Sequence, residues 1–324
     1  MKHQIAILGL IFAGWGLAWA IPHYGWLNPY IQLVLMYLGI NIILAASLNL
    51  VNGFMGEFSV GHAGFMAVGA YAASCLTVAV FPVNWPAVML FPVALVGGGL
   101  AAAVTALIVA VPSFRVRGDY LAIVTLAFCM IVKSVLENIE GVGGPRGFMG
   151  MERLTTLPWV YAWVVLALWM LRNLVYSKYG RGMTAIRDDE IVANLCGINT
   201  RRVKIVAFVV SAFWAGIAGG LFAHLLQFIN PRMFDLLKST EILIMVYLGG
   251  MASLGGSVLG AAIYTIMMEV LRPFGVWRMV LMPLLLVVLM IFRPQGIMGL
   301  REVRWLIPGR DRAAVKPTPP GKDS

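Results

Sequence analysis

Long apolar segments dominate this sequence and restrict its fold more than any other feature. Of the 324 residues, 60% are hydrophobic and only 12% are charged, and the mean hydropathy is +0.87. A soluble domain carries about 25% charged residues, whereas a helix that crosses a bilayer needs about 20 mostly apolar ones. The sequence therefore predicts an all-α, polytopic integral membrane protein with about 8–10 transmembrane helices.

The apolar segments can be placed along the chain. A first helix is expected at residues 4–21, although its ending, Ala18-Trp19-Ala20, also resembles a signal-peptide cleavage site. The other spans are expected at about residues 30–51, 60–80, 87–111, 118–138, 157–175, 203–226, 239–254, 257–271 and 278–292. Residues 1–306 would then form one transmembrane domain, and the Pro-, Lys- and Arg-rich residues 307–324 a disordered basic tail.

The distribution of basic residues predicts the orientation. The net charge is +10, which could suggest nucleic acid, but the basic residues gather in loops between the apolar spans. With ten spans, 17 of the 24 Lys and Arg residues fall on the side of the two termini, six on the other side, and Lys133 within a span. This positive-inside pattern places both termini in the cytoplasm of a bacterial cell whose inner membrane holds the chain. The spans are expected to contact membrane lipid, and no nucleic-acid partner is expected.

One long polar segment, residues 176–202, interrupts the apolar spans; we call it the coupling loop. A short helix is predicted from Asp188 to Cys196, with its acidic residues in the first turn, where the helix dipole favours negative charge, and Gly197 as the terminating glycine. Ile186, Ile191 and Leu195 fall at helical spacing. The loop is therefore predicted to present an apolar side to a soluble partner, the alternative being a solvated connector.

Two glycine-rich regions, residues 49–72 and 248–262, lie inside apolar segments, one in each half of the chain. Non-helical backbone at membrane depth is tolerated only where protein buries it or water lines it. Interrupted segments at corresponding places of two halves are typical of a translocation site, although small residues also serve helix packing. A third interrupted region, GDYLAIVTLAF, has Tyr120 as its third residue. The candidates for a translocation path are Asn49, Asn52, Glu57, Ser59, His62, Tyr120 and Ser253.

The sequence lacks the patterns that catalysis would require. It contains no G-x-x-x-x-G-K-[ST] phosphate loop, no H-E-x-x-H helix and no G-x-S-x-G turn, and Asp188-Asp189 has no second Asp-rich motif. Its three cysteines show neither disulfide nor metal-ligand spacing, so no catalytic residue, cofactor or metal is expected. An ion-coupled secondary transporter stays open as an alternative, with Lys133, Glu137, Glu241 and Glu269 as its candidate ion sites.

Five blocks, in order, carry a resemblance to a known family. They are GFMGEFSVGHAGFMAVGAYAA, RVRGDYLAIVTLAF, GGPRGF, YGRGMTAIRDDEIVANLCGINTRRVKIVAF and YLGGMASLGGSVLGAAI. Over about residues 35–300 the chain resembles the M-type permease subunit of branched-chain amino-acid ABC transporters.

The resemblance implies a function and a set of partners. It implies a pore-forming subunit that moves leucine, isoleucine, valine or similar amino acids. The implied partners are a second homologous permease, two cytoplasmic ATP-binding subunits and a periplasmic substrate-binding protein. Permeases for urea and short-chain amides share the blocks, so these substrates stay open as an alternative. The chain departs from the family at Glu57, where members commonly have Gln.

The resemblance also implies that the segment from Gly180 to Asn199 couples the permease to the ATPase. The residues predicted to carry this coupling are Gly180, Arg187, Asp188, Asp189, Glu190, Ile191, Leu195, Gly197 and Asn199.

Overall fold

The computed structural model describes residues 14–25, 27–80, 87–114 and 120–277. Beyond these it describes residues 280–281, 283–284, 287–288, 291, 296–298 and 302. The expected span at 278–292 therefore lies mostly outside the described residues. The expected tail, 307–324, lies wholly outside them.

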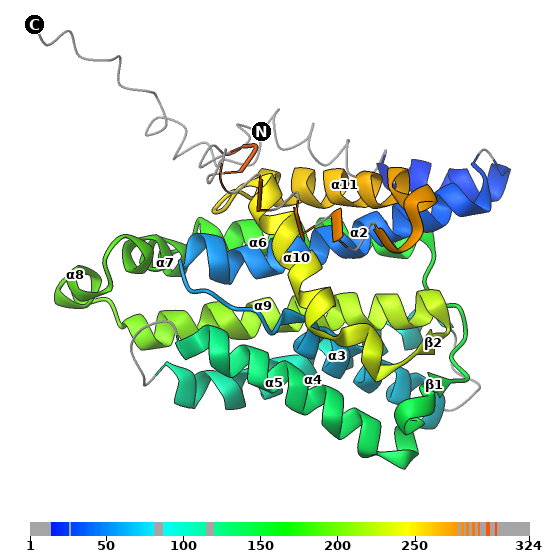
Figure 1. Ribbon diagram of the computed structural model, residues 1–324, viewed down its shortest axis with the longest axis horizontal. Helices are drawn as coiled ribbons and strands as arrows, with labels where there is room; N and C mark the ends of the chain where they lie inside the picture. Colours follow the sequence, from blue (N-terminus) through cyan, green and yellow to red (C-terminus); the bar gives the residue numbers. More distant parts are fainter. Residues whose placement is uncertain are drawn as a thin grey trace, which may run out of the picture.

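The described chain is almost entirely helical (Figure 1). Residues 14–24 are helical and belong to the expected first span. The longer elements that follow are α2 Pro29–Asn49, η1 Leu50–Phe54, α3 His62–Cys75, η2 Leu76–Val80, α4 Ala87–Ser113, α5 Tyr120–Asn138, α6 Leu157–Val175, α7 Lys178–Asp188, α8 Glu190–Leu195, α9 Thr200–Leu226, α10 Leu236–Gly249 and α11 Leu254–Val270. Short elements connect them: η3 Glu140–Val142, η4 Gly144–Arg146, β1 Phe148–Met149, β2 Phe228–Ile229, η5 Pro231–Phe234 and η6 Arg272–Trp277.

Six described segments are long and apolar enough to cross a membrane, which confirms the polytopic fold. They are Pro29–Phe54, His62–Ala79, Val88–Ser113, Tyr120–Asn138, Leu157–Val175 and Thr200–Leu226. The predicted division of 239–271 into two helices is confirmed as α10 and α11. Its position is wrong, because α10 already ends at Gly249, where Gly250 adopts φ 120°. The two helices have only 14 and 17 residues, so each is shorter than the roughly 20 residues that a span requires.

Side-chain caps fix where several helices begin. Asn199 Oδ1 accepts a hydrogen bond from Arg202 N at 3.0 Å at the start of α9, and Ser253 Oγ accepts one from Gly256 N at 3.0 Å at the start of α11. Each cap satisfies a backbone N–H that the first turn leaves without a helical partner.

The helix α9 is the centre of the bundle and packs against α2, α3 and α4. Small residues allow the close approach: a Cβ added to Gly69 of α3 would lie 2.1 Å from Gly216 Cα of α9. Such contacts let backbones approach where lipid offers no hydrophobic drive for helix association. Figure 1 shows α7 and α8 at one end of the long axis and β1 and β2 at the other end. The strands pair antiparallel, with Phe148 opposite Ile229.

Candidate functional site

The two glycine-rich regions predicted from the sequence meet in the structure. The first break, residues 50–61, consists of the π-helical turn η1 and a non-helical segment from residue 55 to the start of α3. The second break, residues 250–253, separates α10 from α11. A Cβ added to Gly53 would lie 2.4 Å from Ala252 N, so the two backbones touch at this point.

Asn49, at the end of α2, joins the first break to the second. Its Nδ2 donates to Ser253 O at 2.8 Å and to Ser257 Oγ at 2.7 Å, and its Oδ1 accepts from Ala252 N at 3.0 Å. Because Asn49 and Ser253 are both buried, these bonds give the side-chain amide of Asn49 hydrogen-bond partners that water cannot supply. Asn49 and Ser253 therefore belong to the junction between the breaks.

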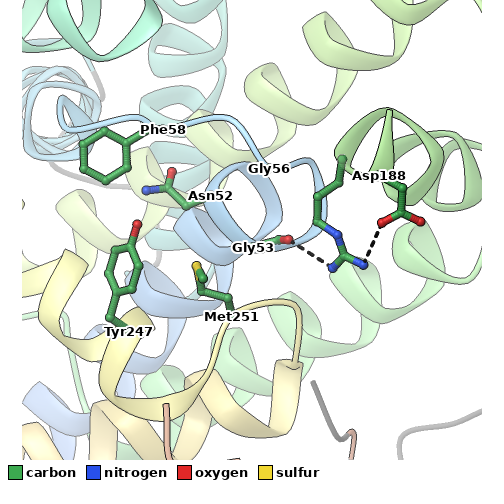
Figure 2. Close-up of a pocket in the computed structure, with 8 residues that line it drawn as sticks. Asn52, Gly53, Gly56, Phe58, Asp188, Tyr247 and Met251 are labelled. Carbon is green, nitrogen blue, oxygen red and sulfur yellow. Dashed lines mark hydrogen bonds and ion pairs between the residues drawn. The ribbon is translucent and has the colours of Figure 1, made fainter. Parts of the chain in front are cut away.

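A cavity of about 480 Å³ opens between the two breaks and the coupling loop. Figure 2 shows Asn52 and Phe58 from the first break near Tyr247 and Met251, with Asp188 of the coupling loop on the other side of Gly53. The remaining lining residues are Gly53, Gly56 and Arg187. Small-molecule sites have volumes of about 300–1,000 Å³ and combine apolar walls with a few polar groups, so this cavity suits an amino-acid-sized solute.

Asn52 lines the cavity and also shapes the first break. Its Nδ2 donates to Ser59 O at 3.3 Å and its Oδ1 accepts from Ser59 N at 3.2 Å, which holds the non-helical segment against η1. The segment is also anchored to α5, because Thr125 Oγ1 accepts from Val60 N at 3.2 Å.

His62 begins α3 and is not among the cavity residues. Its Nε2 lies 2.9 Å from Ser47 Oγ, whose proton goes to Leu44 O, and Ser211 Oγ donates to Ser47 O at 2.6 Å. All of these side chains are buried, so His62 joins α3 to α2 and, through Ser47, to α9. Tyr120, by contrast, begins α5 with its side chain exposed and is not among the cavity residues.

Glu57 is not among the cavity residues and pairs with a buried lysine. Lys204 Nζ of α9 lies 2.5 Å from Glu57 Oε1 and 2.8 Å from Glu190 Oε1 of α8, and Lys204 is only 7% exposed. We call these three residues the ion triad. Sequence reasoning does not single out Lys204, although a lysine one turn inside an apolar span requires a partner.

The coupling loop folds as two helices rather than one, which corrects the predicted helix from Asp188 to Cys196. Asp188 is the last residue of α7, and Asp189 caps α8 by accepting from Ile191 N at 2.8 Å and Val192 N at 3.0 Å. An aspartate side chain in this position competes with the helical backbone for its own N–H groups and ends the preceding helix. Only Glu190 therefore lies in the first turn of α8.

The split also changes the predicted apolar side. Ile186 belongs to α7 and is 5% exposed, whereas Ile191 and Leu195 of α8 are 67% and 83% exposed. The predicted grouping of all three on one side is wrong, because the extended backbone at Asp189 (φ −162°, ψ 115°) interrupts the helix between Ile186 and Ile191. Ile191 and Leu195 remain as an exposed apolar pair on α8, and Figure 1 shows α8 at one end of the long axis.

Gly197 ends α8 as predicted. It adopts φ 81°, its N–H donates to Asn194 O at 3.0 Å, and Ile198 N donates to Ala193 O at 3.1 Å. This pair of bonds is the Schellman arrangement, in which a glycine tolerates the left-handed conformation. Asn199 then caps α9, so the chain turns sharply back toward the bundle.

Two further coupling-loop residues approach backbones closely. Arg187 Nη1 donates to Gly53 O and Nη2 lies by Asp188 Oδ1, both at 3.5 Å, and a Cβ on Gly56 would lie 2.6 Å from Arg187 Cγ. A Cβ on Gly180 would lie 1.8 Å from Val175 O at the end of α6. The loop is thus packed against both α6 and the first break.

Comparisons with known proteins show the family to which the chain belongs. Residues 30–292 match the family described as "Branched-chain amino acid transport system / permease component". The high-affinity branched-chain amino acid transport system permease protein LivM of Escherichia coli is 34% identical over 294 residues, covering 80% of this chain and 68% of the relative.

Two other relatives extend the comparison. The high-affinity branched-chain amino acid transport system permease protein LivH of Salmonella typhimurium is 30% identical over 50% of this chain and 53% of its own length. The probable branched-chain amino acid transport permease protein LivM of Methanocaldococcus jannaschii is 24% identical over 82% of this chain and 92% of its own length. No solved structure matches the chain. The long match over the spans, both breaks and the coupling loop identifies this chain as a member of the family of permease components of branched-chain amino-acid transport systems.

Proposed function

We propose that this chain is a pore-forming subunit of an ATP-driven importer for leucine, isoleucine, valine or similar amino acids. The observation that carries the proposal is the cavity between the two breaks, which the coupling loop contacts through Arg187 and Asp188. In this arrangement the breaks form part of the solute path. The loop connects the path to a subunit that hydrolyses ATP, and its residues named above are proposed in that coupling role. Asn52 is proposed as a path residue because it lines the cavity, and Asn49 and Ser253 as the junction that supports the path.

The cavity wall favours an aliphatic amino acid over urea or a short amide. Phe58, Tyr247 and Met251 present apolar surface, which an aliphatic side chain can cover and a small amide cannot. Asn52, Arg187 and Asp188 supply polar groups of both charges for a zwitterion. The alternative solutes are therefore weaker fits to this space.

The exposed pair Ile191 and Leu195 is proposed as the docking contact for a cytoplasmic ATP-binding subunit. Full burial of a side chain of this size contributes about 1.5–3 kcal/mol, less the cost of ordering the contact. The complete assembly would comprise a second homologous permease, two ATP-binding subunits and a periplasmic substrate-binding protein.

A purification and an uptake assay test the proposal. The tagged chain, expressed with the other subunits and purified in mild detergent, should retain an ATP-binding subunit, and the Ile191→Asp/Leu195→Asp double variant should lose it. Met233→Asp serves as the control, because Met233 is also exposed but lies in η5 at the other end of the bundle. The complete transporter should take up labelled leucine, and this uptake should require ATP. Uptake of labelled urea instead, or uptake driven by an ion gradient without ATP, would contradict the proposed function.

A further inference from the structure

The ion triad connects three elements that are far apart in the chain. Glu57 belongs to the non-helical part of the first break, Glu190 is the first residue of α8, and Lys204 lies in the second turn of α9. The side-chain nitrogen of Lys204 lies between the two carboxylates, at 2.5 and 2.8 Å. It also lies 5.9 Å from the centroid of the Phe114 ring at the end of α4.

Because Lys204 is buried, its ammonium group needs charged partners close to it. An ammonium group is strongly hydrated, and removing it from water is costly unless charged partners replace the lost hydration. Here Lys204 is 7% exposed, whereas the side chains of Glu57 and Glu190 are 19% and 47% exposed. The lysine therefore depends on both carboxylates, and a displacement of either one leaves the charge without full compensation.

The rest of α8 offers little other attachment to the bundle. Of its six residues only Ala193 is buried, and the apolar side chains at 191, 192 and 195 are exposed. Charge-assisted hydrogen bonds are short and directional, so they resist displacement more than a sliding apolar contact does. In the first break residues 56–61 are non-helical, and Glu57 N donates to Val51 O at 3.1 Å, which joins Glu57 directly to η1.

We propose that Lys204 is a positioning residue that transmits movement of α8 to the first break, and that Glu57 serves this link rather than the wall of the solute path. The proposal rests on the proposed function, because it assumes that α8 docks on an ATP-binding subunit. When that subunit moves α8, Glu190 displaces the shared ammonium group. Glu57 follows, and the segment that borders the cavity changes position.

The test uses the complete transporter in proteoliposomes, with the ratio of substrate transported to ATP hydrolysed as its readout. Lys204→Met and Glu57→Leu should each lower this ratio at least about tenfold, within the usual range of coupling between sites. In Glu57→Gln the ratio of substrate transported to ATP hydrolysed should stay near that of the unmodified transporter, because the amide oxygen still accepts a hydrogen bond from Lys204. The double variant Glu57→Leu/Lys204→Met should be no worse than either single variant, as expected for residues that act as a unit.

Lys238→Met is the matched control. Lys238 also pairs with a glutamate, Glu241, at 2.9 Å, and also lies 5.9 Å from a phenylalanine ring centroid, that of Phe222. It belongs to α10 and should leave the ratio unchanged. Should Lys204→Met fail to assemble, Glu190→Ala supplies the same test at a half-exposed position that tolerates the change, and it should also lower the ratio.

The outcomes separate the two proposals. A normal ratio in assembled Lys204→Met or Glu190→Ala complexes would overturn the link. So would Glu57 variants that change the substrate concentration needed for half-maximal uptake while Lys204→Met does not, since that result places Glu57 on the path. If the unmodified complex neither transports leucine nor contains an ATPase, the proposed function fails and the link falls with it.

Discussion

The first break extends over residues 50–61, whereas the second extends over only residues 250–253, although both combine glycines with a serine in similar order. The second break is held on several sides. Asn49 binds it from α2, Ser253 caps α11, and Glu302 accepts from Leu254 N at 2.7 Å and Gly255 N at 2.9 Å. The first break is held at Asn52 and Val60. Its Gly53 O also accepts from Arg187 of the coupling loop, and its Glu57 pairs with Lys204 of α9.

This difference assigns the two breaks different expected roles. The second break is fixed by neighbours within the bundle, so we expect it to serve as the stationary wall of the cavity. The first break is tied to α7, α8 and α9 at the end of the bundle, so we expect it to be the wall that moves. Similar glycine-rich sequences therefore acquire different mechanical properties from what surrounds them.

Breaking the junction between the breaks should have the largest effect. Asn49→Leu removes three hydrogen bonds and leaves Ala252 N without its partner, whereas Ser253 O and Ser257 Oγ keep the hydrogen bond between them. Each buried group left unsatisfied costs about 1–3 kcal/mol, so folded yield and the thermal unfolding midpoint in detergent should fall sharply.

A second asparagine of α2 provides the control. Asn41 makes one hydrogen bond to α11, from Nδ2 to Thr265 Oγ1 at 3.0 Å, so Asn41→Leu should cost clearly less. Equal losses in the two variants would show that Asn49 has no special role at the junction.

A bulky residue at the contact point should separate the breaks while leaving the spans inserted. In Gly53→Val the Cβ would lie 2.4 Å from Ala252 N and even nearer to Asn49 Oδ1, so the first break must shift. Transport per inserted molecule should fall by more than about tenfold, as expected when a path is misplaced by about 1 Å. Gly141→Val, at a position where an added Cβ meets nothing within 4 Å, should transport normally. Normal transport in Gly53→Val would mean that the contact between the breaks is dispensable.

Loosening the second break should affect stability more than transport. Ser253→Ala removes the cap of α11, which costs about 1 kcal/mol of unfolding free energy. If the second break is the stationary wall, the transport rate per folded molecule should stay the same. A large fall in this rate, with most of the protein still folded, would show that the second break moves too.

The smallest effect on stability is expected at the N-terminal end of α10. Asp235 caps α10, and the hydrogen bond from Lys133 at 2.6 Å lowers the pKa of its carboxyl group below the ordinary 3.8. A carboxylate whose pKa is lowered by folding stabilises the protein above its unfolded pKa and loses this contribution as the pH falls through the folded pKa.

Asp235→Asn keeps the cap but loses the ion pair, so it should be less stable by under about 1 kcal/mol at neutral pH. The difference from the unmodified protein should stay constant down to about pH 5 and shrink below about pH 4, as measured by unfolding in detergent. A difference that grows on acidification would contradict the assigned direction of the pKa shift.

Much of the architecture could be predicted from the sequence because it depends on local properties. The apolar run at 157–175 has the same bounds as α6, and the expected spans at 87–111 and 118–138 differ from α4 and α5 by two residues at one end. The turn at Gly197 was also predictable, since a glycine after a short helix has few alternatives. In the coupling loop, however, Asp189 divides the predicted helix, because a side chain that can be a first-turn acid can equally be a cap.

The sequence by itself determined that this chain is a polytopic membrane protein, and it located the two glycine-rich regions and the polar loop between spans. Only the tertiary structure decided that these three parts meet. Asn49 and Ser253 are 204 positions apart, and nothing in their local sequences specifies a hydrogen bond between them. Likewise, Glu57 resembles a residue of the path until folding brings it to Lys204. Hydropathy and capping act over one or two helical turns, whereas the pairing of buried polar groups depends on which helices pack together.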